Sequence, residues 1–452
     1  MMTGGVAARW SMWLILLAAL VGMLLLNWPG HMSVDTVLAL REGRFGVRET
    51  WNPAIFGWLL GIQDSLRPGG SLMTVLNGLL LFGSWMVLPA LRPRTTWLAP
   101  LLALGVVALP QVMIYPGIVW KDVLFAVATL AGFVTLALGV RDRAEAPPWI
   151  ALTLAALLFA VAGLLRQNGL LLALPAALAL AWACSHRGWG RSLSLALGWL
   201  VSVAVLALIL SAVARPQGIG APDDAGGRGI RILQTYDLLA AAALQPGRPT
   251  PRLDIASSEV SDYLRRNATR LYSSERVDVM AADPWLDAHM PELSREVIQA
   301  EWLDLVTGDP ELYLRGRLLA FQQVLATPQI DRCLPLHVGI LGPEKALSDL
   351  GIRPRADVQD GRIYNYATWF FETPAMSHLA YVVIALAVFV ALMVRRDPAD
   401  LMIAGLMVGA LGFAASFFAI SIACDYRYLY LLDISAMTGL LYFMIDPRLK
   451  RG

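Results

Sequence analysis

The chain has 452 residues, of which 57% are hydrophobic and only 15% are charged. A soluble globular protein carries charge on about a quarter of its residues, so this composition argues against a soluble domain and favours a membrane protein. The formal net charge of +2 excludes a general affinity for polyanions, and nucleic acid is therefore not an expected partner.

Ten apolar stretches follow one another along the chain. A bilayer core of about 30 Å is crossed by roughly 20 helical residues. The stretches predict an all-α polytopic membrane protein with helices over residues 13–28, 72–91, 97–115, 119–140, 150–165, 170–184, 193–213, 376–394, 401–423 and 428–445. No small-residue cleavage site follows the first stretch, so we expect a retained helix and not a signal peptide.

Basic residues at the ends of alternate loops predict the orientation of these helices. Arginine and lysine are concentrated in short loops on the cytoplasmic side of a membrane. With a cytoplasmic N-terminus, the predicted cytoplasmic loops and the C-terminal tail contain Arg92, Arg94, Arg141, Arg143, Arg187, Arg191, Arg395, Arg396, Arg448, Lys450 and Arg451. The pattern predicts a polytopic inner-membrane protein whose two termini are cytoplasmic.

The first polar segment on the extracytoplasmic side is residues 31–70. It contains two short helical patterns, over 34–42 and 53–66. The second pattern is apolar but too short to span a bilayer, so we expect a helix that lies at the interface or packs against the bundle.

The second extracytoplasmic segment, residues 215–375, is rich in charge, Pro and Gly and predicts a mainly helical periplasmic domain. Asp309 followed by Pro310 predicts the start of one of its helices. The chain is then divided into a transmembrane module at 1–214, this domain at 215–375, and C-terminal transmembrane helices at 376–452.

Several kinds of site have no support in the sequence. The three cysteines, Cys184, Cys333 and Cys424, are far apart and have neither CxxC nor His/Cys metal spacing, so we predict neither a zinc site nor a disulfide framework. There is no Walker loop, no HExxH, and no GxGxxG or GxSxG in its structural context. Soluble nucleotide and hydrolase chemistry are therefore not indicated.

Asp35 is the first candidate functional residue. It follows the first predicted transmembrane helix, and two interpretations are open. Ser33 or Asp35 could cap the short helix that begins there. Alternatively, Asp35 is a general base at the membrane surface.

Three cations also fall at predicted extracytoplasmic helix ends. Lys121, next to Asp122, begins the fourth helix; Arg166 precedes Asn168 between the fifth and sixth; Arg427 follows Tyr426 before the last. Each cation also has a structural interpretation. Lys121 could form an interfacial ion pair with Asp122, Arg166 could be a snorkelling side chain at a helix end, and Arg427 could be an interface anchor. Cations fixed in a water-poor cleft would instead stabilise the charge on a leaving phosphate.

The order of these motifs resembles that in the GT-C glycosyltransferases, which include protein O-mannosyltransferases and the aminoarabinose transferase of lipid A. An acid after helix one, a short helix, a Gly-aromatic turn and Trp51-Asn52-Pro53 resemble their first extracytoplasmic loop. Residues 115–122, 165–169 and 425–430 extend the resemblance, and a bacterial branch has a segment similar to 302–317. Many members have paired acids after helix one, whereas Asp35 here stands alone.

The resemblance implies an inverting glycosyltransferase that moves a sugar from a polyprenyl-phosphate carrier to a cell-envelope acceptor, lipid or polysaccharide, at the periplasmic face. Asp35 would be the base, and Lys121, Arg166 and Arg427 would bind the donor phosphate in one cleft between membrane and periplasmic domain. Some members need a divalent metal and others do not. The sequence contains no acid cluster that would identify a metal site, so we assign no cofactor and leave a divalent metal open.

Weaker candidates for acceptor binding or support are Asp122, Asn168, Tyr426, Asp237, Glu372 and His31. A solvated loop histidine is the alternative for His31. Trp28, Trp97, Tyr115 and Trp120, at helix ends, match an aromatic belt at the membrane interface.

Other classes of function remain as alternatives. A transporter or flippase for a lipid-linked saccharide would need charged residues in mid-membrane and usually repeated or broken helices, whereas here the charges collect at one face and no repeat is evident. An oligosaccharide polymerase or ligase shares the layout of many helices with a large periplasmic loop. A receptor role would leave an uncharged junction between domain and membrane.

Overall fold

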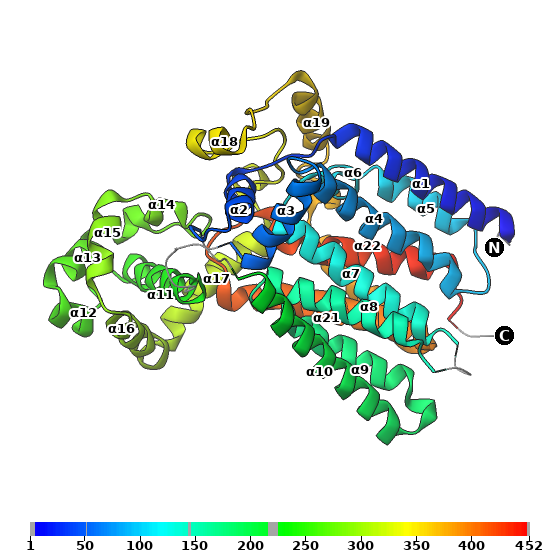
Figure 1. Ribbon diagram of the computed structural model, residues 1–452. Coiled ribbons are helices and arrows are strands. Elements are labelled where there is room, and N and C mark those ends of the chain that lie inside the picture. Colours follow the sequence, from blue (N-terminus) through cyan, green and yellow to red (C-terminus); the bar gives the residue numbers. More distant parts are fainter. Residues whose placement is uncertain (1–4, 51, 143–145, 216–224, 450–452) are drawn as a thin grey trace. The chain divides into compact units, whose positions relative to one another are not determined.

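The computed structural model describes residues 5–50, 52–142, 146–215 and 225–449. These residues form helices joined by loops (Figure 1). The α-helices are α1 (Val6–Asn27), α2 (Val34–Phe45), α3 (Ala54–Leu66), α4 (Ser71–Val87), α5 (Leu98–Val107), α6 (Pro110–Met113), α7 (Lys121–Val140), α8 (Trp149–Leu165), α9 (Ala173–Ala183), α10 (Trp189–Val213), α11 (Ala225–Leu244), α12 (Pro251–Ala256), α13 (Ser258–Leu271), α14 (Asp278–Ala281), α15 (Pro284–His289), α16 (Arg295–Gly308), α17 (Pro310–Ala326), α18 (Glu344–Leu350), α19 (Val358–Thr368), α20 (His378–Arg395), α21 (Pro398–Ile420) and α22 (Tyr430–Ile445). The 3₁₀ helices are η1 (Leu88–Leu91), η2 (Tyr115–Gly117), η3 (Gly169–Leu172), η4 (Ser185–Arg187), η5 (Met290–Glu292), η6 (Ile330–Cys333), η7 (Pro374–Met376) and η8 (Tyr426–Leu429).

Seven helices in the described part of the chain are long and apolar enough to cross a bilayer, which confirms an all-α polytopic membrane protein. They are Val6–Asn27, Ser71–Leu91, Lys121–Val140, Trp189–Val213, His378–Arg395, Pro398–Ile420 and Tyr426–Ile445.

The other three predicted spans differ from simple transmembrane helices. The span 97–115 is broken into Leu98–Val107 and Pro110–Gly117, which meet at 78°, because Pro110 has no amide hydrogen to continue the helical ladder. Trp149–Leu165 and Gly169–Ala183 are shorter apolar helices. By length and composition the described residues thus provide seven spans, or eight if the bent pair is one, where the sequence predicted ten.

Helix α7 forms the centre of the bundle. In its most apolar stretch 83% of the residues are buried, and it packs against α4, α8 and α22. At Gly132 an added Cβ atom would lie 2.8 Å from the ring of Phe159, so glycine permits the close approach of α7 and α8. The start of this helix at Lys121 is therefore held by several neighbours.

The two short helices predicted after α1 are present as α2 and α3, and they cross at close range. A Cβ atom on Gly43 would lie 1.8 Å from the carbonyl oxygen of Gly57, so only glycine fits at this crossing. The left-handed Gly46 then ends α2, its N–H donating to the carbonyl of Glu42.

Extended backbone from three distant parts of the chain meets at the residues that precede α2. His31 pairs with Ile118 and Met32 with Ile340, both in parallel bridges, and Ile340 pairs with Arg355 in an antiparallel bridge. Residues 336–355 thus join the loop after α1 to the turn before α7.

The chain divides into two compact units. Unit 1 comprises Met1–Ala221, Leu336–Phe413 and Leu429–Gly452, and unit 2 comprises Pro222–Pro335 and Ala414–Tyr428. Compact packing does not report the side of the membrane on which a segment lies. The division at 1–214, 215–375 and 376–452 therefore stays a prediction.

Unit 2 contains its own hydrophobic core, formed by α11 to α17. The predicted helix start at Asp309 is confirmed: its side chain accepts a hydrogen bond from the N–H of Leu312, and Pro310 occupies the first turn of α17.

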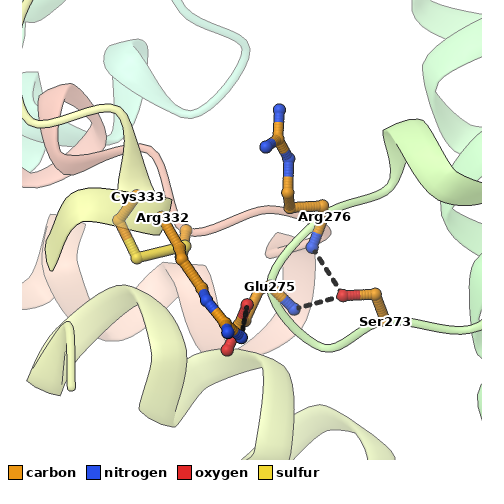
Figure 2. The surroundings of a disulfide bond; sticks show 6 residues. Ser273, Glu275, Arg276, Arg332 and Cys333 are labelled. Carbon is orange, nitrogen blue, oxygen red and sulfur yellow. Dashed lines mark hydrogen bonds and ion pairs between the residues drawn. A yellow bond between two sulfur atoms is a disulfide. The ribbon is translucent and has the colours of Figure 1, made fainter. Parts of the chain in front are cut away.

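The expectation of no disulfide is wrong for unit 2. Cys333 and Cys424 are bonded, with their Cα atoms 4.9 Å apart. Figure 2 shows the surroundings, where Arg332 pairs with Glu275 at 3.5 Å. The two cysteines are 91 residues apart in the sequence. No local spacing could therefore predict the bond, which depends on the tertiary fold. Cys184 is a free, buried thiol.

Candidate active site

Asp35 lies in the first turn of α2 and is half-buried. A negative charge is stabilised there by the dipole of the helix. The side chain of Ser33 does not cap the helix; its hydroxyl instead accepts a hydrogen bond of 2.9 Å from Nε1 of Trp120. Ser33 therefore connects α2 to the start of α7.

Asn52 joins Asp35 to Lys121. Its Nδ2 donates to the carbonyl oxygen of Asp35 at 3.2 Å, and its Oδ1 accepts from Nζ of Lys121 at 3.2 Å. Because an ammonium only donates and a carbonyl only accepts, these partners determine the orientation of the amide. Asn52 is buried. The sequence indicated it only as part of the motif Trp51-Asn52-Pro53, of which Trp51 lies outside the described residues.

Asp122 and Arg166 form an ion pair beside this junction. Asp122 is buried in the first turn of α7, and Arg166 directly follows α8. Only 12% of the Arg166 side chain is exposed, and its guanidinium carbon lies 5.7 Å from the ring centre of Phe413. Arg166 is therefore held inside the fold, unlike a snorkelling side chain at a helix end.

His31 is buried, which excludes a solvated loop histidine. Its Nδ1 accepts hydrogen bonds of 2.9 Å from the N–H of Gly339 and from Arg355. The proton must then be on Nε2, which donates to Oδ1 of Asn27 at 3.0 Å. Burial and the adjacent Arg355 lower the pKa of His31 from 6.5 to about 4, so the ring is neutral near pH 7. Its partners make it an anchor for residues 336–355.

His337 on this anchored segment is a residue that sequence reasoning missed. Its Nε2 lies 3.0 Å from the carbonyl oxygen of Met32, and its ring centre lies 6.5 Å from that of Trp120. It lies beside the start of α2 although 302 positions separate it from Asp35, and no local motif could have indicated this.

Three aromatic rings in contact with one another pack beside the start of α7. Tyr430 stacks on Tyr115 with ring centres 4.7 Å apart, and Tyr115 meets Trp120 edge-on at 6.0 Å. Tyr115 and Trp120 are fully buried. The expectation that these two belong to an aromatic belt is therefore wrong, because both are core residues that hold Lys121 in place.

A second missed feature is the buried pair His378 and Asp433. Nδ1 of His378 lies 2.8 Å from Oδ1 of Asp433, between the first turns of α20 and α22. Ionisable residues in membrane-spanning helices are costly to bury and are therefore often functional. Here the pair lies at the ends of two helices.

Three of the predicted residues lie in unit 2. Arg427 forms an ion pair of 3.0 Å with Asp425, and Tyr426 is fully buried. Asp237 is buried against Arg317 and accepts a hydrogen bond of 2.9 Å from Nε1 of Trp302. Burial raises the pKa of Asp237, and Arg317 opposes this effect.

Two further predicted residues lie in unit 1. Asn168 is half-buried just before η3, two positions after Arg166. Glu372 is exposed in the turn after α19, with a backbone φ of 59°. Asn52 thus contacts the backbone of Asp35 and the ammonium of Lys121, and Asp122, the next residue in α7, pairs with Arg166. Within the described ranges, no three His, Cys, Asp or Glu side chains form a group that could hold a metal ion.

Comparison with protein-family models and with curated proteins gives no match. Among solved structures, the chain is similar to the archaeal oligosaccharyltransferase AglB from Archaeoglobus fulgidus in complex with an inhibitory peptide and a dolichol-phosphate, with 15% identity and a TM-score of 0.38. The alignment covers 95% of this chain and 50% of AglB, so the chain spans about half the length of that protein. A TM-score of this size does not establish a common fold.

Proposed function

We propose that the protein is a membrane glycosyltransferase that moves a sugar from a polyprenyl-phosphate carrier to a cell-envelope acceptor. The observation that supports this most is the junction at Asn52, which connects the acid-bearing turn of α2 to the ammonium of Lys121. Next to it, Arg166 is held by Asp122. An acid and two fixed cations at helix ends suit a reaction that deprotonates one oxygen and releases a phosphate.

In the proposed reaction Asp35 takes the proton of an acceptor hydroxyl while that oxygen attacks the anomeric carbon. The bond from this carbon to the carrier phosphate breaks on the opposite face, and the lipid phosphate leaves with the electron pair. The configuration at the anomeric carbon is therefore inverted. Lys121 and Arg166 stabilise the leaving phosphate. Positioned proton transfer contributes on the order of 10²–10⁴ in rate.

The disulfide supports the proposed sidedness. Disulfides persist in oxidising compartments such as the bacterial periplasm and are rare in the cytosol. We infer that the part of unit 2 with Cys333 and Cys424 is periplasmic, in a bacterial inner-membrane protein with cytoplasmic termini. Because both cysteines are buried, an exposed position of unit 2 is used as the reporter: a membrane-impermeant maleimide applied to intact spheroplasts should label an Asp278→Cys variant. Labelling only after the membrane is permeabilised would mean that this part of unit 2 is cytoplasmic, opposite to the proposed orientation.

The function is tested by transfer of radiolabelled sugar from polyprenyl-phosphate donors in proteoliposomes. The Asp35→Asn variant should fold but lose transfer by about 10²-fold or more. Asp142→Asn, which changes an exposed aspartate paired with Arg141, is the matched control and should leave turnover unchanged. Undiminished turnover in Asp35→Asn would remove Asp35 as the base.

The buried pair His378 and Asp433 favours a transporter or flippase instead, because such proteins use ionisable groups at membrane depth. Its position at helix ends is less suited to this role than mid-membrane. If Asp433→Asn stopped labelled lipid from crossing proteoliposomes while no donor was turned over, transport would replace transfer. Product analysis would separate a monosaccharide transferase from an oligosaccharide polymerase or ligase.

A further inference from the structure

Unit 1 contains a cavity of about 590 Å³, within the size range of small-molecule binding sites. The end of α2 with the loop after it, the first turns of α3, and the last residues of α10 form its walls. The lining side chains that matter for its chemistry are Glu42, Arg44, Arg48, Trp58, Val213 and Arg215.

Arg48 and Arg215 are two of the arginines that line the cavity. Nη1 of Arg48 donates to the carbonyl oxygen of Asn52, and the carboxylate of Glu42 is 4.0 Å away. The side chain of Arg215 is exposed and makes no hydrogen bond or ion pair to another described residue. Arg44 donates to Asp64 and to the carbonyl of Leu350. Arginine in such a cavity favours a phosphate, whose oxygens accept its forked N–H groups.

The cavity also adjoins a surface suited to a lipid tail. Helix α10 is a candidate membrane span, and only 22% of its most apolar stretch is buried. Its exposed apolar side chains near the cavity are Val205, Leu208, Ile209 and Val213. A ligand that approaches along this face would place an apolar chain against α10 and its charged group at Arg48 and Arg215.

We propose that this cavity binds the phosphate of an anionic membrane lipid, and that this lipid is the sugar acceptor. The second part rests on the proposed glycosyl transfer. Arg48 contacts Asn52, which in turn contacts the backbone of Asp35 and the ammonium of Lys121. The donor phosphate is assigned to Lys121 and Arg166, so a separate pair of arginines is left for the acceptor. This arrangement favours a lipid over a polysaccharide acceptor.

The binding test uses the full chain in nanodiscs of neutral lipid, with radiolabelled phosphatidylglycerol as the probe. The variant with Arg48→Gln and Arg215→Gln should bind it about 10- to 100-fold more weakly, because two charge-assisted contacts are lost. Replacing both residues by lysine should restore part of the affinity, which separates lost charge from misfolding. Arg362→Gln, at a cavity lined by α1 and α19, is the matched control and should bind as wild type does.

Competitors identify the ligand. Unlabelled phosphatidylglycerol should displace the probe, whereas inorganic phosphate and diacylglycerol, which carry the head or the tail alone, should not. Displacement by either compound at a similar concentration would contradict the proposal that the ligand is a lipid phosphate. Displacement by polyprenyl phosphate at a tenfold lower concentration overturns the acceptor assignment, because the cavity would then belong to the donor.

Transfer kinetics separate this proposal from the proposed function. The double arginine variant should raise KM for the acceptor lipid at least tenfold with little change in kcat, whereas Asp35→Asn should lower kcat and leave lipid binding intact. If the arginine variant binds lipid as wild type does, the cavity proposal fails and the transferase stands. If lipid binding follows expectation but no donor is turned over, the transferase and the acceptor role fail, and only a lipid site remains.

Discussion

Arg166–Asp122 in unit 1 and Arg317–Asp237 in unit 2 are both buried arginine–aspartate pairs, yet their surroundings differ. Arg317 is completely buried, and it also donates to the carbonyl oxygens of Ala419 and Ser421 at 3.1 Å each. Trp302 donates to the other oxygen of Asp237. This pair therefore ties α11, α16 and α17 to the end of α21.

The pair in unit 1 is placed differently. Arg166 is partly exposed and rests against Phe413, and Asp122 is adjacent in the chain to Lys121. A buried ion pair is therefore not by itself a sign of function. What distinguishes the two is the access of solvent to the arginine, whose side chain is 0% exposed in Arg317 and 12% exposed in Arg166.

The largest expected effect is on the structural pair. Arg317→Ala leaves the carboxylate of Asp237 buried without its cation and should lower the free energy of unfolding by about 3–5 kcal/mol. Thermal or urea unfolding in detergent measures this loss. Arg270→Ala, which breaks an ion pair of a mostly exposed arginine with Asp283, should cost below about 1 kcal/mol. Equal losses in the two variants would contradict the structural role of Arg317.

The site pair should affect turnover more than stability. In the double variant Arg166→Gln and Asp122→Asn, both charges are removed together and hydrogen bonding remains available. Transfer should fall by about 10²–10³-fold, the usual effect of losing one stabiliser of developing charge. Arg141→Gln with Asp142→Asn neutralises an exposed pair and serves as control. If the two double variants are equally active, Arg166 does not act on the donor phosphate.

His31 should make the stability of unit 1 depend on pH. Its pKa is lowered to about 4 in the folded protein, so the unfolded chain binds a proton more readily between pH 6.5 and 4. The stabilisation is complete above pH 6.5 and is lost as the pH falls through this range, by roughly 3 kcal/mol in total. Thermal melts from pH 7.5 to 4 should show this slope for wild type and a shallower one for His31→Gln. Parallel slopes would mean that another group titrates.

The smallest effect on turnover is expected from a change at Asn52. Asn52→Ala removes the contact between the backbone of Asp35 and the ammonium of Lys121, each a single hydrogen bond. Turnover should fall by about tenfold, because one bond to a charged group is typically worth about 1.5–3 kcal/mol. Asn365→Ala, on the exposed face of α19, is the control. A loss as large as that of Asp35→Asn would mean that Asn52 does more than position its neighbours.

The sequence by itself determined the features that depend on local pattern. Apolar length predicted the membrane-spanning helices, and Asp309 with Pro310 predicted the start of α17, because hydropathy and helix capping act over a few neighbouring residues. The charged residues Lys121 and Arg166 could be singled out for the same reason, since charge at the end of an apolar run is visible in the sequence alone.

Only the tertiary structure decided the partners of these residues. The bond between Cys333 and Cys424, the anchoring of His31 by Arg355, and the contact of His337 with Met32 join positions 91 to 324 residues apart. Such contacts depend on how helices cross, and the crossing of α2 and α3 at Gly43 depends on backbone atoms whose approach no local pattern encodes. For the same reason Asn52, ordinary in the sequence, became the centre of the candidate site.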